Sequence, residues 1–418
     1  MAELYRKLYS NNRLRSAWQS IYENGISSKS PTIRTEIEQF SLSLEKNLRR
    51  IADQLREKRY VFSQSYGVAV KKKNNPSKKR PIVISPIPNR IVQRALLDVV
   101  QEIPSVRAKL DSGFNFGGIA EIGVPQAILK AYKTALEKPY FIRTDICAFF
   151  DNIPRSQALE IITSASKDDD FNTLLTQATT TELSNLITLG RDKELFPLEG
   201  KGVAQGSCLS PVLCNLLLDD FDKKMNARGI VCIRYIDDFI LFAPSESKAF
   251  KAFASASAFL EKLNLSVYDP RHSPDKAEHG VSNKGFEFLG CSVRPDRIRP
   301  SDKSIKRLRD RVNEIFDKVI KKSSSPLRCI NEKTTYKDAL NEVSSTIRGW
   351  GNTYSFCTDD HLMINLDRYI SEKILNFNRR YKQKIRAFSP EDKRRLLGVF
   401  LLQDCKKDES MRATVTAI

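Results

Sequence analysis

Short apolar runs that contain or end in aspartate occupy the middle of the chain. Residues 231–242 are mostly apolar and carry the adjacent Asp237 and Asp238 near their centre. Two strand-like halves that meet at a pair of carboxylates predict a tight hairpin with both aspartates at the bend. A solvated turn is the ordinary interpretation of such a pair. Burial without partners would be costly, so the alternative is an exposed cleft or a bound cation, and oxygen ligands of this kind suit Mg²⁺.

A second strand-like run bears on that choice. Residues 140–145 end at Asp145, and two phenylalanines, Phe149 and Phe150, follow. If this strand lies beside the hairpin, Asp145 joins the other two aspartates in one acidic cluster. Three carboxylates at close range repel one another unless cations neutralise them. Two Mg²⁺ ions would do so and could stabilise the attacking and leaving oxygens of a phosphoryl transfer.

The chain between these two elements contains a glycine loop at residues 203–211. Gly206 allows a ligand to approach the backbone closely, and the Gln205–Ser207 stretch around it calls for a functional interpretation. Ser210–Pro211 predicts the N-cap and first residue of a helix with an apolar core face. We interpret Asp151, upstream of the loop, as a helix cap.

Most of the remaining chain has a helical pattern. Residues 1–60 are polar and mostly helical in pattern, with an apolar stripe at helical spacing from Leu44 to Leu55. A basic turn at residues 71–80 separates two strand-like runs. The aspartate-rich residues 164–170 are expected to form a surface loop, and residues beyond about 406 a loose tail. Further helices are predicted at residues 86–140, at 154–200 and at 244–263, the last of them beneath the sheet. An amphipathic helix is predicted from Ser301, and helices continue to about Phe388. A last helix is predicted to begin at Ser389–Pro390.

Composition limits the class of protein. The 418 residues can bury a large core, and the net charge of +19 argues for a polyanionic partner. From Cys291 onward 28 Lys and Arg stand against 17 Asp and Glu, so more than half of the excess lies there. The eight cysteines form no paired framework and predict reduced thiols, and the three histidines are too scattered for a zinc site. Without a membrane-length apolar run or a signal-peptide core, we expect a cytoplasmic protein.

The motifs together resemble those of the reverse transcriptases. Three of them occur in that family's order and spacing: Asp145 with Phe149–Asp151 as the first catalytic motif, Gln205–Ser207 with Ser210–Pro211 and Asn215 as the nucleotide pocket, and Tyr235–Asp238 as the second catalytic motif. The combination is highly specific. Ala204 stands where the family's pocket loop has proline, which should alter the rigidity of the loop more than its chemistry.

The likeness continues on both sides and covers roughly residues 12 to 370. It includes Lys79–Ile82 and Asn89–Leu96 in the fingers, Phe114–Gly118 in the next fingers motif, Pro274–Lys276 and Phe286–Gly290 in the palm, and Ile347–Tyr354 in the thumb of group II intron enzymes. No endonuclease-like segment and no retron signature follow. The chain therefore resembles the stand-alone, group II intron-like bacterial reverse transcriptases, a class that includes defence-associated and abortive-infection enzymes.

This resemblance implies a fold and a division into domains. The fold is an α+β right-hand polymerase, with an antiparallel palm sheet plus helices and an α-helical thumb. We expect an N-terminal helical extension at residues 1–60, fingers and palm at residues 61–300, and the thumb with a basic C-terminal region at residues 301–418.

The resemblance also implies RNA-directed DNA synthesis from dNTPs. Asp145, Asp237 and Asp238 would be catalytic and, with Ile146, would bind two Mg²⁺ ions, or Mn²⁺ in their place; Lys276 would protonate the pyrophosphate, although a surface lysine is the plain alternative. The nucleotide would contact Lys79, Arg80, Phe149, Phe150, Gln205, Gly206 and Tyr235, with Phe150 rather than Phe149 rejecting a 2′-hydroxyl. Phe288, Leu289 and Gly290 would support the primer end.

The implied partners are an RNA template, DNA product and dNTPs, without a membrane. A dedicated non-coding RNA template and a role in anti-phage defence are expected by analogy with the class. Two other functions stay open, a group II intron-type maturase that only binds RNA and an RNA-dependent RNA polymerase. The aromatic Phe150 argues against the latter, because ribonucleotides need room for the 2′-hydroxyl. Priming and oligomeric state stay open.

Overall fold

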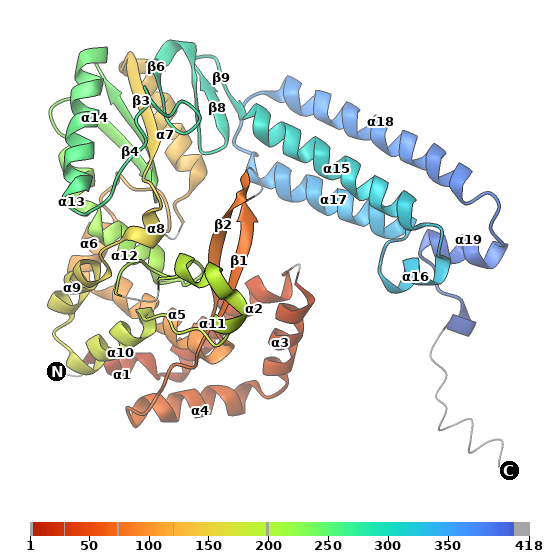
Figure 1. Ribbon diagram of the computed structural model, residues 1–418, viewed down its shortest axis with the longest axis horizontal. Helices are drawn as coiled ribbons and strands as arrows, with labels where there is room; N and C mark the ends of the chain where they lie inside the picture. The colour runs from red at the N-terminus through yellow and green to blue at the C-terminus, as the bar shows by residue number, and fades with distance from the viewer. Residues whose placement is uncertain (1–2, 29, 73–74, 120, 198–199, 405–418) are drawn as a thin grey trace. The chain divides into compact units, whose positions relative to one another are not determined.

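The computed structural model describes residues 3–28, 30–72, 75–119, 121–197 and 200–404 (Figure 1). The chain divides into two compact units, Met1–Asn283 and Lys284–Ile418. The predicted tail beyond residue 406 lies outside the described residues. The functional division at residues 60 and 300 stays a prediction.

The larger sheet of the first unit carries the acidic residues. Its strand order is β4–β5–β3–β6, and all neighbouring strands are antiparallel. Helix α14 packs against β3 and β5, and helix α7 packs against β4 and β5, so β5 is buried from Phe239 to Ala243. The predicted hairpin and the predicted neighbouring strand are confirmed. The strands are β3 (Tyr140–Asp145), β4 (Val231–Tyr235), β5 (Asp238–Ala243) and β6 (Glu278–Val281).

A second hairpin in this unit consists of β1 (Tyr66–Lys72) and β2 (Asn75–Ile84). Its strands are longer than the pattern predicts, because most of the basic segment 71–80 pairs as strand rather than forming a turn. Residues 73 and 74, at the expected tip, lie outside the described residues. The side chain of Asn185 bonds both backbone groups of Gly67 at 2.9 Å and fixes this hairpin to the helical insertion.

Helices form the rest of the first unit and bury one large core. The 164–170 segment differs from the prediction of a surface loop, because Asp168 is buried and accepts backbone N–H groups of Phe171 and Tyr5 at 3.1 and 3.0 Å. Its carboxylate caps α10 and anchors the N-terminal helix. The helices are α1 (Glu3–Leu8), α2 (Asn11–Ile26), α3 (Pro31–Leu42), α4 (Leu44–Arg56), α5 (Ile87–Glu102), α6 (Pro104–Leu110), α7 (Val124–Glu137), α8 (Phe149–Asn152), α9 (Arg155–Ser166), α10 (Asp169–Thr179), α11 (Leu186–Leu189), η1 (Gly190–Leu195), α12 (Ser210–Leu217), α13 (Asp219–Met225) and α14 (Glu246–Glu261).

The second unit is a small antiparallel sheet with a group of helices. The apolar stripe predicted after Ser301 is buried along α15, and the side chains of Ser301 and Ser389 cap their helices as N-caps do. The elements are β7 (Phe286–Phe288), β8 (Cys291–Arg294), β9 (Arg297–Pro300), α15 (Asp302–Lys322), α16 (Pro326–Asn331), α17 (Tyr336–Thr353), α18 (Asp360–Lys384), α19 (Pro390–Leu397) and η3 (Leu402–Asp404), with η2 (Ser282–Lys284) at the junction of the units.

These elements confirm the predicted α+β class, with an antiparallel sheet plus helices in the first unit and a mainly helical second unit. In the part of the chain that the structure describes, no helix is both long and apolar enough to cross a membrane.

Candidate active site

The three aspartates lie together at one end of the larger sheet. Asp145, the last residue of β3, is the cross-strand partner of Asp238, the first residue of β5. Asp238 in turn pairs with Tyr235 across the hairpin. The backbone N–H of Ile146 donates to the carbonyl oxygen of Asp237 at 3.0 Å. The strand ends therefore place all three carboxylates in one region, as the sequence predicts.

The charges of this acidic cluster are poorly compensated within the protein. Burial raises the pKa of all three carboxyls, and the pKa of Asp238 rises to about 7 because the charges of Asp237 and Asp145 add to the cost of burial. The charges of Lys276, Arg143 and Arg80 act in the opposite direction. The ammonium of Lys276 lies 3.6 Å from a carboxylate oxygen of Asp145, and the charge of Arg143 lowers the pKa of Asp145 and Asp238. The opposing cations are weaker than burial and repulsion, so the cluster favours an added cation.

The donor set fits a hard divalent cation. Three carboxylates supply oxygen ligands, and Ile146, which has no side-chain donor, could add only its carbonyl oxygen. Among the described residues, no three carboxyl, thiol or imidazole groups already converge as a metal site. The metal-binding roles stay predictions.

The glycine loop contacts the β1–β2 hairpin through its backbone. The N–H of Val83 donates to the carbonyl of Gln205 at 2.8 Å, and Gly206 has a φ of +118°. A Cβ on Gly206 would lie 2.5 Å from the carbonyl oxygen of Val83, so glycine is required there. The side-chain amide of Gln205 donates to Asp151 at 3.0 Å.

Two capping assignments at this loop are wrong. Asp151 lies within the short helix α8 and accepts from Gln205, whereas Pro154 precedes the next helix without a side-chain cap. Ser210 is already the first helical residue, and its hydroxyl donates instead to the carbonyl of Ala204 at 2.7 Å. Both polar side chains therefore hold the loop rather than cap a helix, and the role of Asp151 was missed.

The two predicted phosphate-binding cations differ in their surroundings. Lys79 forms an ion pair with Asp192 of the helical insertion, at 2.6 Å. Arg80 is exposed, and its charge lowers the pKa of Asp151 and Asp237. The structure therefore brings Arg80 into electrostatic range of the acidic cluster, while Lys79 has a partner within the protein.

The aromatic residues predicted to contact the nucleotide differ in their exposure. Phe149 is 2% exposed and lies in the main core, whereas Phe150 and Tyr235 are half-buried. The rings of Phe149 and Phe150 meet edge to face with centroids 5.9 Å apart. Phe150 is therefore the more exposed ring of the pair, and its contact with the sugar stays a prediction.

The residues predicted to support the primer belong to the second unit. Phe288 is buried, and Leu289 and Gly290 form the turn between β7 and β8 with φ values of +46° and +79°. Positive φ at both central residues is typical of a tight hairpin turn. Their role stays a prediction.

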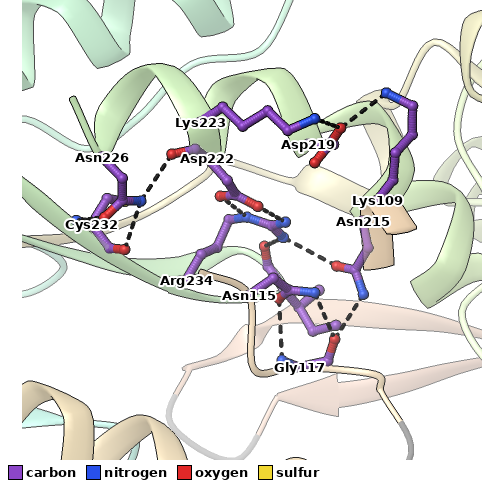
Figure 2. Close-up of polar contacts among 11 residues, drawn as sticks. Lys109, Asn115, Gly117, Asn215, Asp219, Asp222, Lys223, Asn226, Cys232 and Arg234 are labelled. Atoms are coloured by element: carbon purple, nitrogen blue, oxygen red, sulfur yellow. Dashed lines mark hydrogen bonds and ion pairs between the residues drawn. The ribbon is translucent and has the colours of Figure 1, made fainter. Parts of the chain in front are cut away.

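One further polar group was missed entirely. Arg234, three residues before Asp237, is fully buried and bonded to Asp222, which is also buried (Figure 2). The signal was present in the sequence, because an arginine within the apolar run 231–242 requires a buried partner.

The antiparallel sheet β4–β5–β3–β6 carries the three carboxylates at one end. The family described as reverse transcriptase (RNA-dependent DNA polymerase) matches residues 70–293, which is more than half of the chain. The chain therefore belongs to the reverse transcriptase family, and the predicted enzyme class is confirmed.

Similar curated proteins agree with this family. The chain is 25% identical over 294 residues to protein YkfC of Escherichia coli strain K12, covering 60% of this chain and 72% of that protein. It is 33% identical over 88 residues to a putative COX1/OXI3 intron 2 protein of Saccharomyces cerevisiae, covering 21% and 9% of the two chains. The name of the second relative, an intron protein, fits the predicted likeness to group II intron proteins.

Solved structures show a weaker likeness. A chain of the partial Cas6-RT-Cas1--Cas2 complex is 21% identical with a TM-score of 0.36, covering 61% of this chain and 40% of its own length. A Candida albicans telomerase is 11% identical with a TM-score of 0.40, covering 87% and 67%. Likeness of this degree adds nothing to the family match.

Proposed function

We propose that this protein synthesises DNA from dNTPs on an RNA template, with the acidic cluster as its catalytic centre. The observation that carries the proposal is the pairing of Asp145 with Asp238 beside Asp237, which gathers three poorly compensated carboxylates within the family's polymerase region. Perturbed carboxyls of this kind are typical of sites that bind charged ligands.

Asp145, Asp237, Asp238 and the Ile146 carbonyl would hold two divalent ions, Mg²⁺ or Mn²⁺. Bound there, the ions would stabilise charge on the attacking 3′-hydroxyl and on the leaving pyrophosphate. The family generally uses divalent ions, and the oxygen-only donor set suits them.

The surrounding side chains would bind and orient the nucleotide. Gln205, held by Asp151, and the exposed backbone of Gly206 line the approach to the base pair. Phe150 would exclude a 2′-hydroxyl by bulk. Arg80 would contact the triphosphate. Lys79 would contact the triphosphate as well once its ion pair with Asp192 is broken.

Lys276 is the proposed source of a proton in this reaction. Its ammonium is half-exposed and lies 3.6 Å from Asp145, so it can approach both solvent and the reacting phosphates. We propose that it donates a proton to the departing pyrophosphate. The net charge of +19 supports backbone contacts to a nucleic acid duplex, which bind without sequence choice and weaken with salt.

A primer-extension assay tests the polymerase assignment. Purified protein is given an RNA template with a DNA primer, Mg²⁺, and either dNTPs or NTPs. The proposal expects extension with dNTPs and little with NTPs. Extension with NTPs alone would favour an RNA-dependent RNA polymerase, and no extension with either would contradict the polymerase assignment.

The proposal extends to a dedicated non-coding RNA template, a cytoplasmic location and a role in anti-phage defence. Its support is the resemblance to a class that includes defence-associated enzymes. The test is to express the gene with its native flanking DNA and sequence all nucleic acid bound to the purified protein. One abundant flanking RNA with complementary DNA would support a dedicated template, whereas heterogeneous RNA without DNA would contradict it. Phage plating on cells with and without the gene tests the defence role.

A maturase is the second candidate, because similar proteins are encoded in introns. Such a protein would bind intron RNA and promote its splicing without DNA synthesis. Splicing of an intron from the flanking DNA, dependent on protein but independent of the three aspartates, would establish this function.

A further inference from the structure

Arg234, in strand β4 of the hairpin that carries Asp237 and Asp238, forms a buried ion pair with Asp222. Its Nε and Nη2 donate to the two carboxylate oxygens of Asp222 at 2.8 and 2.5 Å, and both side chains are at most 1% exposed. This two-point geometry is the strongest arrangement available to arginine and carboxylate. Asp222 lies on α13, so the pair joins that helix to β4 (Figure 2).

The remaining nitrogen of the guanidinium, Nη1, reaches the turn that carries Asp237. Nη1 of Arg234 donates to the carbonyl oxygen of Ile236 at 3.0 Å. Ile236 has a φ of +60°, a left-handed conformation that is unfavourable for a β-branched side chain. Such strain persists only where surrounding contacts impose it. The bond from Arg234 is one such contact, and it acts on the peptide unit that leads into Asp237.

A second set of contacts supports the same turn from the fingers motif. Nη1 of Arg234 also donates to the side-chain oxygen of Asn215 at 3.1 Å, and the amide of Asn215 donates to the carbonyl of Gly117 at 2.7 Å (Figure 2). A Cβ on Gly117 would lie 2.7 Å from Cγ1 of Ile236, so the glycine backbone packs directly on the turn. Asn215 belongs to α12, the helix that follows the glycine loop.

We propose that Arg234 is a positioning residue that, with Asp222 and Asn215, sets the conformation of the catalytic turn and couples it to the helix of the nucleotide pocket. This inference rests on the proposed function. Stability alone does not require the pair, because well-packed hydrophobic residues often replace a buried ion pair without loss of stability. What they cannot replace are the directed N–H groups that hold the Ile236 carbonyl.

The chain supplies a matched control on the same helix. Asp219 is a buried carboxylate one turn before Asp222, and it bonds to Lys109 and Lys223 at 2.9 and 2.7 Å (Figure 2). Asp219→Asn therefore perturbs a buried charge on α13 through partners other than Arg234.

The experiment compares Asp222→Asn, Arg234→Lys and Asp219→Asn with the wild-type protein. Single-turnover incorporation gives the maximal rate and the apparent affinity for dNTP, and a separate titration gives primer–template affinity. We expect the first two variants to lose about 10- to 100-fold in maximal rate, as small misplacements of catalytic groups do. We expect their primer–template affinity, and the maximal rate of Asp219→Asn, to change by less than about threefold.

A hydrophobic replacement separates positioning from stability. Asp222→Leu with Arg234→Met removes both charges and is expected to unfold at a denaturant concentration close to that of the wild type. If Arg234 positions the turn, the maximal rate of dNTP incorporation by this folded double variant falls as it does in the single variants.

Near wild-type rates in this double variant, or in folded Asp222→Asn and Arg234→Lys, would overturn the inference. An equal loss of rate in Asp219→Asn would also overturn it, because any buried charge on α13 would then suffice. Failure of the proposed function has a different signature, since the wild-type protein itself would not incorporate dNTPs.

Discussion

The β4–β5 hairpin connects two charged groups that differ in how their charge is compensated. Arg234 and Asp222 are fully buried, and each satisfies the other with paired hydrogen bonds. The acidic cluster, three residues further along, consists of like charges whose nearest cation is a half-exposed lysine at 3.6 Å. The first group is compensated within the protein, whereas the three carboxylates of the second are not. One hairpin thus carries an internally compensated ion pair and part of the acidic cluster that we propose to be catalytic.

The largest expected effect is the loss of activity when a carboxylate of the acidic cluster is removed. Asp145→Asn should lower the rate of dNTP incorporation by about 10³-fold or more, because loss of metal stabilisation is worth several kcal/mol in the transition state. Single-turnover primer extension measures this rate. Asp220→Asn on the exposed face of α13 is the control and should match the wild type. Comparable rates for Asp145→Asn and the control would mean that the cluster is not catalytic.

The two groups should respond oppositely to loss of a carboxylate when stability is measured. Asp222→Ala leaves an uncompensated buried arginine and should lower the free energy of unfolding by about 3–5 kcal/mol. Asp237→Ala removes a repulsive charge and should leave the free energy of unfolding unchanged or higher. Urea unfolding in the absence of divalent ions gives both values. Equal destabilisation by the two variants would mean that the ion pair and the acidic cluster do not differ in how their charge is compensated.

Divalent ions should stabilise only the protein that retains the acidic cluster. At a free Mg²⁺ concentration of about ten times the dissociation constant, binding adds about 1.4 kcal/mol to the free energy of unfolding. Thermal unfolding of the wild type should therefore shift upward with Mg²⁺. Asp237→Ala/Asp238→Ala should show no shift, and an equal shift in that variant would place the bound ion elsewhere.

A further effect is a pH dependence of stability without metal. Because burial and the neighbouring carboxylates raise the pKa of Asp238 to about 7, the folded protein holds a proton that the unfolded chain has released. Asp238 therefore lowers stability as the pH rises from about 4 to about 7, and adds no slope above that. Urea unfolding in EDTA at pH 5 to 8 should show Asp238→Asn gaining on the wild type as the pH rises. A constant difference would contradict the raised pKa.

Local patterns predicted the acidic cluster well. Asp145, Asp237 and Asp238 each stand at the end of an apolar run, and antiparallel pairing of those runs brings their ends together. Strand length was less predictable. Lys71 and Lys79 pair as partners within β1 and β2, where their charge had suggested a turn.

Contacts between distant segments could not be predicted. Lys79 pairs with Asp192 and Asp168 caps α10 while bonding Tyr5, and neither sequence position indicates the partner. The role of Arg234 was accessible in part, because its burial within an apolar strand implied some acidic partner. Identifying that partner as Asp222 required the packing of α13 on the sheet.

The most direct test of the account measures synthesis and binding in the same Asp237→Ala/Asp238→Ala protein. Single-turnover dNTP incorporation is recorded at primer–template concentrations where the wild type and the variant are equally occupied. The account predicts that incorporation is abolished while RNA-template affinity stays close to that of the wild type, because we attribute nucleic-acid binding to the excess of Lys and Arg rather than to the acidic cluster. Retained synthesis by the variant would contradict the assignment of the active site.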